Sequence, residues 1–163
     1  MDSFDDVLSA NAAYAEHFVD PGRPGIAARG LAVVMCMDSR ISPLEMLGLE
    51  PGDAKILRNA GARVTDDVLR TLVLASYLLS VSRVMVVAHT DCRMTGGTED
   101  DVHRAISGQG GPDTRSLVFQ VTNDVDASLR EDVQRIKSFP YLSSLEVGGF
   151  LYDVRTGRIE QRA

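Results

Sequence analysis

Three short apolar runs, each followed by a polar segment and then by a helical pattern, constrain the fold of this 163-residue chain more than any other feature. The runs cover residues 31–35, 55–58 and 84–88. Short apolar runs rich in β-branched residues are typical of strands buried on both faces of a parallel sheet. Because helical patterns alternate with the runs, we predict an α/β fold with a mostly parallel central sheet flanked by helices.

The remaining patterns complete a single domain over residues 1–163. Ser42 followed by Pro43 and Glu45 predicts a capped helix start. Near the C-terminus we expect a strand and an antiparallel edge strand joined as a hairpin. No segment is long enough to act as a domain linker, and residues 1–25 are predicted to form a helical arm at a subunit interface. The other expected helices cover residues 4–19, 66–81, 99–106 and 123–139, and the last two strands cover 145–154 and 158–160.

Composition argues against several classes of protein. The chain has 17 basic and 23 acidic residues and no dense basic run, so we expect no nucleic-acid partner. No apolar stretch approaches the ~20 residues that span a bilayer, and the N-terminus is acidic where a signal peptide would be basic. We therefore predict a soluble cytoplasmic protein with no membrane partner. A compact monomer of this mass is expected to expose roughly 8,000 Å².

The two cysteines of the chain, Cys36 and Cys92, each follow a predicted strand, and His89 stands three residues before Cys92. The carboxyl ends of parallel strands lie at one edge of a sheet, so these side chains can converge. Zinc accepts thiolate and imidazole ligands, and three protein ligands leave a fourth position open. A disulfide or two inert core thiols are the alternatives, and the His89 spacing favours a metal. His17 and His103 have less suggestive surroundings.

Two charged residues follow Cys36 closely. Asp38 is near enough to ligate the same ion or to accept a hydrogen bond from metal-bound water. Arg40 is placed to hold Asp38 in a bidentate ion pair, which is the strong form of that contact. An ordinary surface salt bridge, which contributes little, is the alternative interpretation.

Taken together, three motifs resemble the signature of the β-class carbonic anhydrases, in the compact prokaryotic subtype. Their order and spacing both agree with that family, and the α/β pattern between them is compatible. The motifs are Cys36-x-Asp38-Ser39-Arg40, Arg58-Asn59-Ala60-Gly61 and His89-x-x-Cys92, with a familiar Tyr152-Asp153-Val154-x-Thr156-Gly157 tail.

The resemblance implies a zinc-dependent carbonic anhydrase that hydrates CO2 reversibly to bicarbonate and a proton through zinc-bound hydroxide. It implies Zn²⁺ held by Cys36, His89 and Cys92. Asp38 would either take the fourth zinc position or turn to Arg40 and admit water, so activity is expected to rise with pH. The family also implies a homodimer or homotetramer.

Two departures from the family pattern and two alternative functions stay open. Arg93 follows Cys92 where the family commonly has glycine, and the substrate-binding glutamine of the larger subtypes has no assigned counterpart. One alternative is a non-catalytic zinc protein that senses bicarbonate, with Asp38 as a permanent fourth ligand. The other is a related hydrolase of CS2 or COS, which could use identical ligands.

Overall fold

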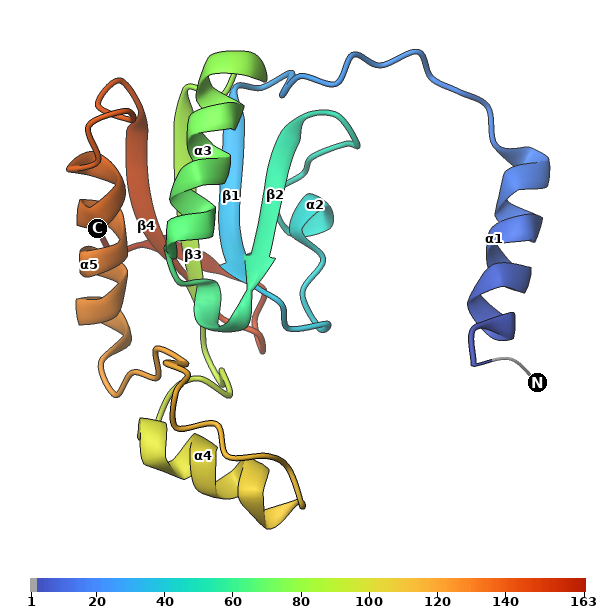
Figure 1. Ribbon diagram of the computed structural model, residues 1–163. Coiled ribbons are helices and arrows are strands. Elements are labelled where there is room, and N and C mark those ends of the chain that lie inside the picture. The colour runs from blue at the N-terminus through green and yellow to red at the C-terminus, as the bar shows by residue number, and fades with distance from the viewer. Residues whose placement is uncertain (1–2) are drawn as a thin grey trace.

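A five-stranded sheet forms the centre of the computed structural model, which describes residues 3–163; Met1 and Asp2, the start of the acidic N-terminus, lie outside the described residues (Figure 1). The strand order is β2-β1-β3-β4-β5, with β4 and β5 antiparallel and the other pairs parallel. The predicted mostly parallel sheet with a C-terminal hairpin is therefore confirmed. The strands are β1 Leu31–Cys36, β2 Ala54–Asn59, β3 Arg83–His89, β4 Glu146–Tyr152 and β5 Ile159–Gln161.

The predicted helices are present, with ends that differ by a few residues. Three of them begin with a side-chain cap: the Thr65, Thr98 and Asp124 side chains accept hydrogen bonds from the amides of Val68, Asp101 and Ala127, respectively. The helices are α1 Asp5–His17, α2 Pro43–Met46, α3 Asp66–Leu78, α4 Glu99–Gly108 and α5 Val125–Lys137, with a 3₁₀ turn, η1, at Ala60–Ala62.

One face of the sheet packs tightly against α3 and α5 (Figure 1). Alternate residues of β1, Ala32 and Val34, point to this side and are fully buried. Gly149 in β4 lets α5 approach closely, because a Cβ atom there would lie 2.9 Å from the Leu129 side chain and 3.0 Å from that of Val133. Because of this close approach, the buried core between the sheet and the helices extends over β3 and β4.

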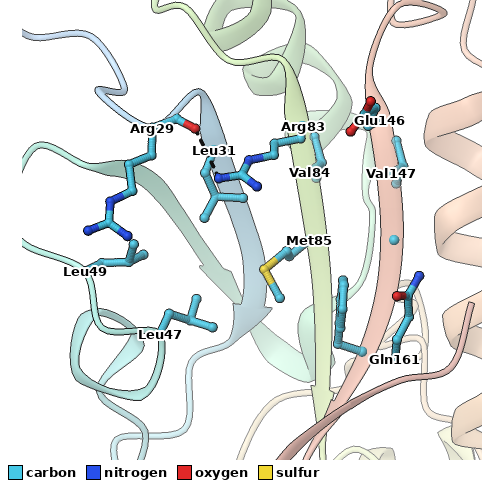
Figure 2. A pocket seen from close by; sticks show the side chains of 12 residues that line it. Arg29, Leu31, Leu47, Leu49, Arg83, Val84, Met85, Glu146, Val147 and Gln161 are labelled. Carbon is cyan, nitrogen blue, oxygen red and sulfur yellow. Dashed lines mark hydrogen bonds between the residues drawn. The ribbon is translucent and has the colours of Figure 1, made fainter.

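The opposite face has less cover. Leu31 and Met35 of β1 point to this side, where α2 and the segment after it pack. Figure 2 shows a groove of about 400 Å³ on this face, over the amino-terminal halves of β1, β3 and β4. Its floor includes Leu31 and Met85, and Arg29 and Arg83 lie at its rim.

Two helices differ in detail from the sequence-based expectations. Helix α2 begins after Ser42 with Pro43 in its first turn, as predicted, but the Ser42 side chain makes no capping bond. The helix ends after four residues, shortly before Gly48, which has a φ of +60°. The helix predicted over residues 66–81, α3, buries only a narrow apolar stripe. Tyr77 and Leu78 are largely exposed, since they lie outside the buried stripe. That stripe consists of Val68, Leu69, Leu72 and Ala75.

Helix α1 extends away from the rest of the chain (Figure 1). None of its residues is buried, although Leu8 and Tyr14 are large apolar side chains. Within residues 3–163, no helix has both the length and the apolar composition needed to cross a bilayer.

Candidate metal centre

The predicted ligands lie where the order of the sheet reverses. From β1 the chain passes to β2 on one side of it and then to β3 on the other, so β1 and β3 flank the switch point. Cys36 is the last residue of β1 and His89 the last residue of β3. Ligand sites of open α/β sheets form in the crevice outside the carboxyl ends of the strands at such a point.

One cluster contains Cys36, His89 and Cys92. Among the described residues, it is the group of cysteine, histidine and acidic side chains that could hold a metal ion. Their potential ligand atoms all lie within 4.8 Å of one another, and all three residues are buried. The two sulfur atoms are 3.9 Å apart, and both cysteines are free. Two sulfurs bound to one tetrahedral zinc ion lie about 3.8 Å apart. The cluster therefore fits zinc, and the disulfide alternative is not what the structure contains.

The hydrogen bonds of His89 prepare one ring nitrogen for a metal. Its Nδ1 lies 2.8 Å from the Thr90 carbonyl oxygen, which can only accept, so Nδ1 carries the proton. The other nitrogen, Nε2, is buried and has no hydrogen-bond partner. A buried polar atom without a partner is costly unless a ligand satisfies it, and a neutral imidazole with a free Nε2 is the form that binds metals.

Thr90 in turn is fixed by the C-terminal hairpin. The Thr90 amide donates to the Tyr152 carbonyl, and the Thr90 hydroxyl accepts a hydrogen bond of 3.1 Å from the Val154 amide. The orientation of the His89 ring thus depends on residues more than sixty positions later in the chain. The sequence had shown the Tyr152–Gly157 tail only as a family feature, without this contact.

The surroundings of the Cys92 thiol oppose its ionisation. Burial raises the pKa of the Cys92 thiol to about 11, and the neighbouring Cys36 sulfur adds to the increase. A divalent cation between the two sulfurs opposes both effects, because it stabilises the thiolate forms. The donor set of two thiols and one imidazole is the kind that zinc prefers.

Asp38 and Arg40 form the bidentate ion pair expected from the sequence. Arg40 Nη2 lies 2.6 Å from Asp38 Oδ2, and Nε lies 3.0 Å from Oδ1. These bonds hold the pKa of the Asp38 carboxyl well below its usual range, so this group is ionised at neutral pH. The same Oδ2 lies 3.9 Å from His89 Nε2, which puts the carboxylate beside the cluster.

Arg58 organises the loop that contains Asp38. Its guanidinium donates to three backbone carbonyls, those of Cys36, Asp38 and Ile41. The sequence contained Arg58 as part of a motif but gave no sign that it binds this loop. Only a search of the structure for side-chain donors that have no partner within their own strand or helix identifies this role.

The wall behind Cys92 is formed by η1 and Met94. Gly61 has a φ of +77°, and a Cβ atom there would lie 3.1 Å from the Met94 Cβ, so both the backbone conformation and the close contact favour glycine. Arg93 has an exposed side chain and does not have a positive φ. The departure from glycine at this position is therefore accommodated without a strained turn.

The remaining histidines lie outside the cluster. His17 is exposed on α1, where its Nδ1 bonds to the Ala13 carbonyl. His103 on α4 bonds to the Thr114 hydroxyl and lies against the Phe119 ring. Neither belongs to the metal-binding group of the described residues, as the sequence analysis expected.

Comparison with known proteins gives consistent relatives. A solved structure of the carbonic anhydrase of Streptococcus mutans superposes with a TM-score of 0.92 at 36% identity, covering 100% of this chain and 99% of the other. The Beta-carbonic anhydrase 1 of Mycobacterium tuberculosis is 35% identical over 158 residues, covering 96% of both chains.

More distant relatives act on a different molecule. A carbon disulfide hydrolase of Acidithiobacillus thiooxidans is 26% identical over 187 residues, covering 98% of this chain and 86% of the hydrolase. The similarity to this hydrolase is lower than that to the carbonic anhydrases, and it extends over nearly the whole chain.

The family profile described as carbonic anhydrase matches residues 31–138, which include both strands that carry the cluster and every residue of the Cys36, His89 and Cys92 group. The β-carbonic anhydrases are zinc enzymes, and the cluster described above fits that metal. With a profile match over more than half of its length and a curated relative at 35% identity, this chain belongs to the β-carbonic anhydrase family.

Proposed function

We propose that this protein catalyses the reversible hydration of CO2 to bicarbonate and a proton. Cys36, His89 and Cys92 would hold Zn²⁺, and Asp38 and Arg40 would be the catalytic pair. The observation that carries this proposal is the free, buried Nε2 of His89 between two thiols and 3.9 Å from the Asp38 carboxylate. Zinc, when bound, supplies Lewis-acid chemistry that makes water a nucleophile near neutral pH.

Asp38 is suited to accept a hydrogen bond from that water and so to orient it. Its side chain is 17% exposed, so one edge of the carboxylate is within reach of solvent. Arg40 engages both of its oxygens and keeps the carboxylate charged and in place. Because the pKa of Asp38 is held well below its usual range, an increase in activity above pH 6 would report ionisation of the water and not of Asp38.

The decisive experiment is stopped-flow CO2 hydration across pH, with zinc measured on the same sample. We expect activity to rise from mildly acidic to alkaline pH at constant zinc content. Zinc-loaded protein with no CO2 hydration at any pH would contradict the proposal and favour a zinc protein without this activity. A flat profile would contradict the role of water ionisation.

Asp38→Ala tests the role of the carboxylate. We expect it to retain zinc and to lose about 100-fold or more of kcat, because the water would lose the carboxylate that orients it. Asp113→Ala is a matched control, because Asp113 makes the same type of fork with Arg115 far from the cluster in sequence. Near-normal CO2 hydration by Asp38→Ala would remove Asp38 from the mechanism.

Hydrolysis of CS2 is the second candidate, favoured by the relative from Acidithiobacillus thiooxidans. A metal held by the same cluster would activate water toward either linear molecule, so substrate access to the cluster decides between them. Sulfide release from CS2, measured beside CO2 hydration on one preparation, separates the two. We expect CO2 to be the faster substrate; a larger kcat/KM for CS2 would reverse the assignment.

We also propose that α1 is an arm that packs on a second copy of this chain. The chain exposes 10,285 Å², about 2,300 Å² more than a compact monomer of its mass. Parallel sheets are normally covered on both faces, yet the groove over β1, β3 and β4 is open. Its rim carries Arg29 and Arg83 (Figure 2). Helix α1 begins with the acidic Asp5 and Asp6. The groove of a second copy is the proposed site for the arm.

Light scattering after size exclusion tests this arrangement. We expect wild-type protein to form a homodimer or homotetramer, and Leu8→Glu, which alters a 63% exposed apolar residue of α1, to shift it toward monomer. Leu117→Glu is the control, since Leu117 is a 54% exposed apolar residue outside α1. A monomeric wild type would contradict the proposal, as would equal effects of the two variants.

The cytoplasmic location remains our proposal. The two free cysteines support it, because cytosolic thiols are kept reduced and available to a metal. Fractionation of the source cells, with detection of the protein in the soluble or the secreted fraction, tests it.

A further inference from the structure

Arg40 contacts a second carboxylate besides that of Asp38. Its Nη1 donates to Asp91 Oδ2 at 2.8 Å, and its Nη2 donates to the Asp91 carbonyl oxygen at 3.0 Å. Asp91 lies between the ligands His89 and Cys92, so this contact joins the loop after β3 to the loop after β1. All three nitrogens of the guanidinium are thereby engaged.

The backbone of Asp91 is in an uncommon conformation. Its φ is +56°, in the left-handed region that most residues avoid and that aspartate tolerates better than others. In this conformation both the carbonyl and the carboxylate of Asp91 reach the same guanidinium. Left-handed non-glycine residues persist where the surrounding structure requires them and often occur at functional sites.

A second Asp-x-Arg fork elsewhere in the chain shows what Asp91 adds. Asp113 and Arg115 form the same fork, with Nη2–Oδ2 at 2.6 Å and Nε–Oδ1 at 2.9 Å. The Arg115 side chain is 78% exposed, whereas that of Arg40 is 49% exposed. The fork therefore forms from local sequence alone, and the clamp by Asp91 is what distinguishes the pair beside the cluster.

We propose that Asp91 is a positioning residue that clamps Arg40 and thereby holds the Asp38 carboxylate at the metal centre. The inference rests on the proposed function, because it concerns the same catalytic pair. Without the clamp, the exposed Arg40 side chain would sample other rotamers and take Asp38 with it. The residue touches neither the substrate nor the ligand atoms, and it acts only through Arg40.

Three substitutions separate the carboxylate from the backbone conformation. Asp91→Gly removes the carboxylate but suits a φ of +56°, Asp91→Ala removes it and adds backbone strain, and Asp91→Asn keeps an acceptor of the same shape without the charge. We expect the glycine and alanine variants to lose about tenfold in kcat with unchanged KM for CO2 and full zinc content, with asparagine intermediate. Wild-type kcat in Asp91→Gly would overturn the proposal.

Combining these variants with Arg40→Ala tests whether Asp91 acts through Arg40. If it does, Asp91→Gly causes no further loss in the Arg40→Ala background. A tenfold loss that persists in that background would overturn the proposal. Asp113→Asn is the matched control, with wild-type kcat expected.

A readout independent of activity uses the Arg40 Nε–H resonance, assigned by its loss in Arg40→Lys. In wild-type protein the clamp should slow exchange of this proton with water, with or without zinc, and Asp91→Gly should speed it by about tenfold or more. Unchanged exchange would overturn the proposal. If wild-type protein fails to hydrate CO2, the proposed function has failed, and the exchange measurement alone decides whether Asp91 clamps Arg40.

Discussion

The loop after β1 (residues 37–42) and the loop after β3 (residues 90–95) meet at one metal centre, but different kinds of contact hold them. Arg58, a single side chain from β2, donates to three carbonyls in and beside the loop after β1. The loop after β3 is held mainly through its own backbone and the Thr90 hydroxyl, which bond to the C-terminal hairpin. Asp91 then joins the two loops through Arg40.

Because of this difference, substitutions in the supports of the two loops should have different effects. Loss of one side chain removes all three guanidinium contacts of the loop after β1. The loop after β3 shares its support among several backbone bonds, so a single substitution there should alter the orientation of His89 before it unfolds the loop. Stability and metal affinity are therefore the measurements that separate the two.

Arg58→Met should have the largest effect. Methionine retains much of the aliphatic length but removes the three Arg58 hydrogen bonds to the carbonyls of Cys36, Asp38 and Ile41, of which the Asp38 carbonyl keeps only its bond from the Ile41 amide. At about 1 kcal/mol for each lost hydrogen bond, we expect the free energy of unfolding to fall by about 3 kcal/mol, together with loss of zinc. Urea unfolding and metal analysis measure both quantities.

The control for this prediction is Arg70→Met. Arg70 forms an exposed pair with Asp67 on α3, and exposed pairs contribute little, so a change below about 0.5 kcal/mol is expected. Equal effects of the two substitutions would show that Arg58 is an ordinary surface arginine and would remove the contrast between the loops.

Thr90→Val should have a smaller effect, confined to the metal. Valine keeps the shape of threonine but cannot accept the bond from the Val154 amide, so the carbonyl that orients His89 loses its support. We expect about tenfold weaker zinc binding in a competition with a chromogenic chelator, and about 1 kcal/mol of stability loss.

Thr90→Ser is the matched variant, because serine keeps the hydroxyl. It should bind zinc within about twofold of wild type. If serine and valine weaken zinc binding equally, the threonine methyl group and not the hydroxyl supports the loop, and the proposed route from the hairpin to His89 is wrong.

The contrast between the loops also explains what could be predicted from the sequence. Ligand residues are recognised from their chemistry and from their position after a strand, which is why Cys36, His89 and Cys92 were found together. Asp38 and Arg40 were found because an Asp-x-Arg fork forms between near neighbours. These predictions needed only local spacing and the rule that parallel strand ends meet at one edge.

The supporting contacts were not predictable in the same way. Arg58, Thr90 and Asp91 act through bonds to residues 17 to 64 positions away. Such bonds depend on the register between strands and on individual backbone angles, such as the positive φ of Asp91. Neither leaves a pattern in composition or periodicity.

Substitution of Glu99 should have the smallest effect on activity. Glu99 lies in the excursion, by which we mean residues 96–124 between the loop after β3 and α5. Its carboxylate accepts bonds of 2.8 Å from the amides of Phe119 and Val121, which lower the pKa of Glu99 from its ordinary 4.5. The contribution of these bonds is therefore present above pH 4.5 and is lost as pH falls through the lower, folded-state pKa.

Titration of the Phe119 and Val121 amide resonances by NMR measures this pKa directly. We expect a midpoint below 4.5 in wild type, no such transition in Glu99→Gln, and wild-type behaviour in Glu45→Gln, a change in the distant α2. Because Met94 and Thr122 are joined by their own backbone bond, the loop after β3 should keep its shape when residues 117–121 are released. Glu99→Gln should then retain CO2 hydration at neutral pH within about twofold; a loss comparable to that of Thr90→Val would show that the excursion, and not the hairpin alone, holds His89 in place.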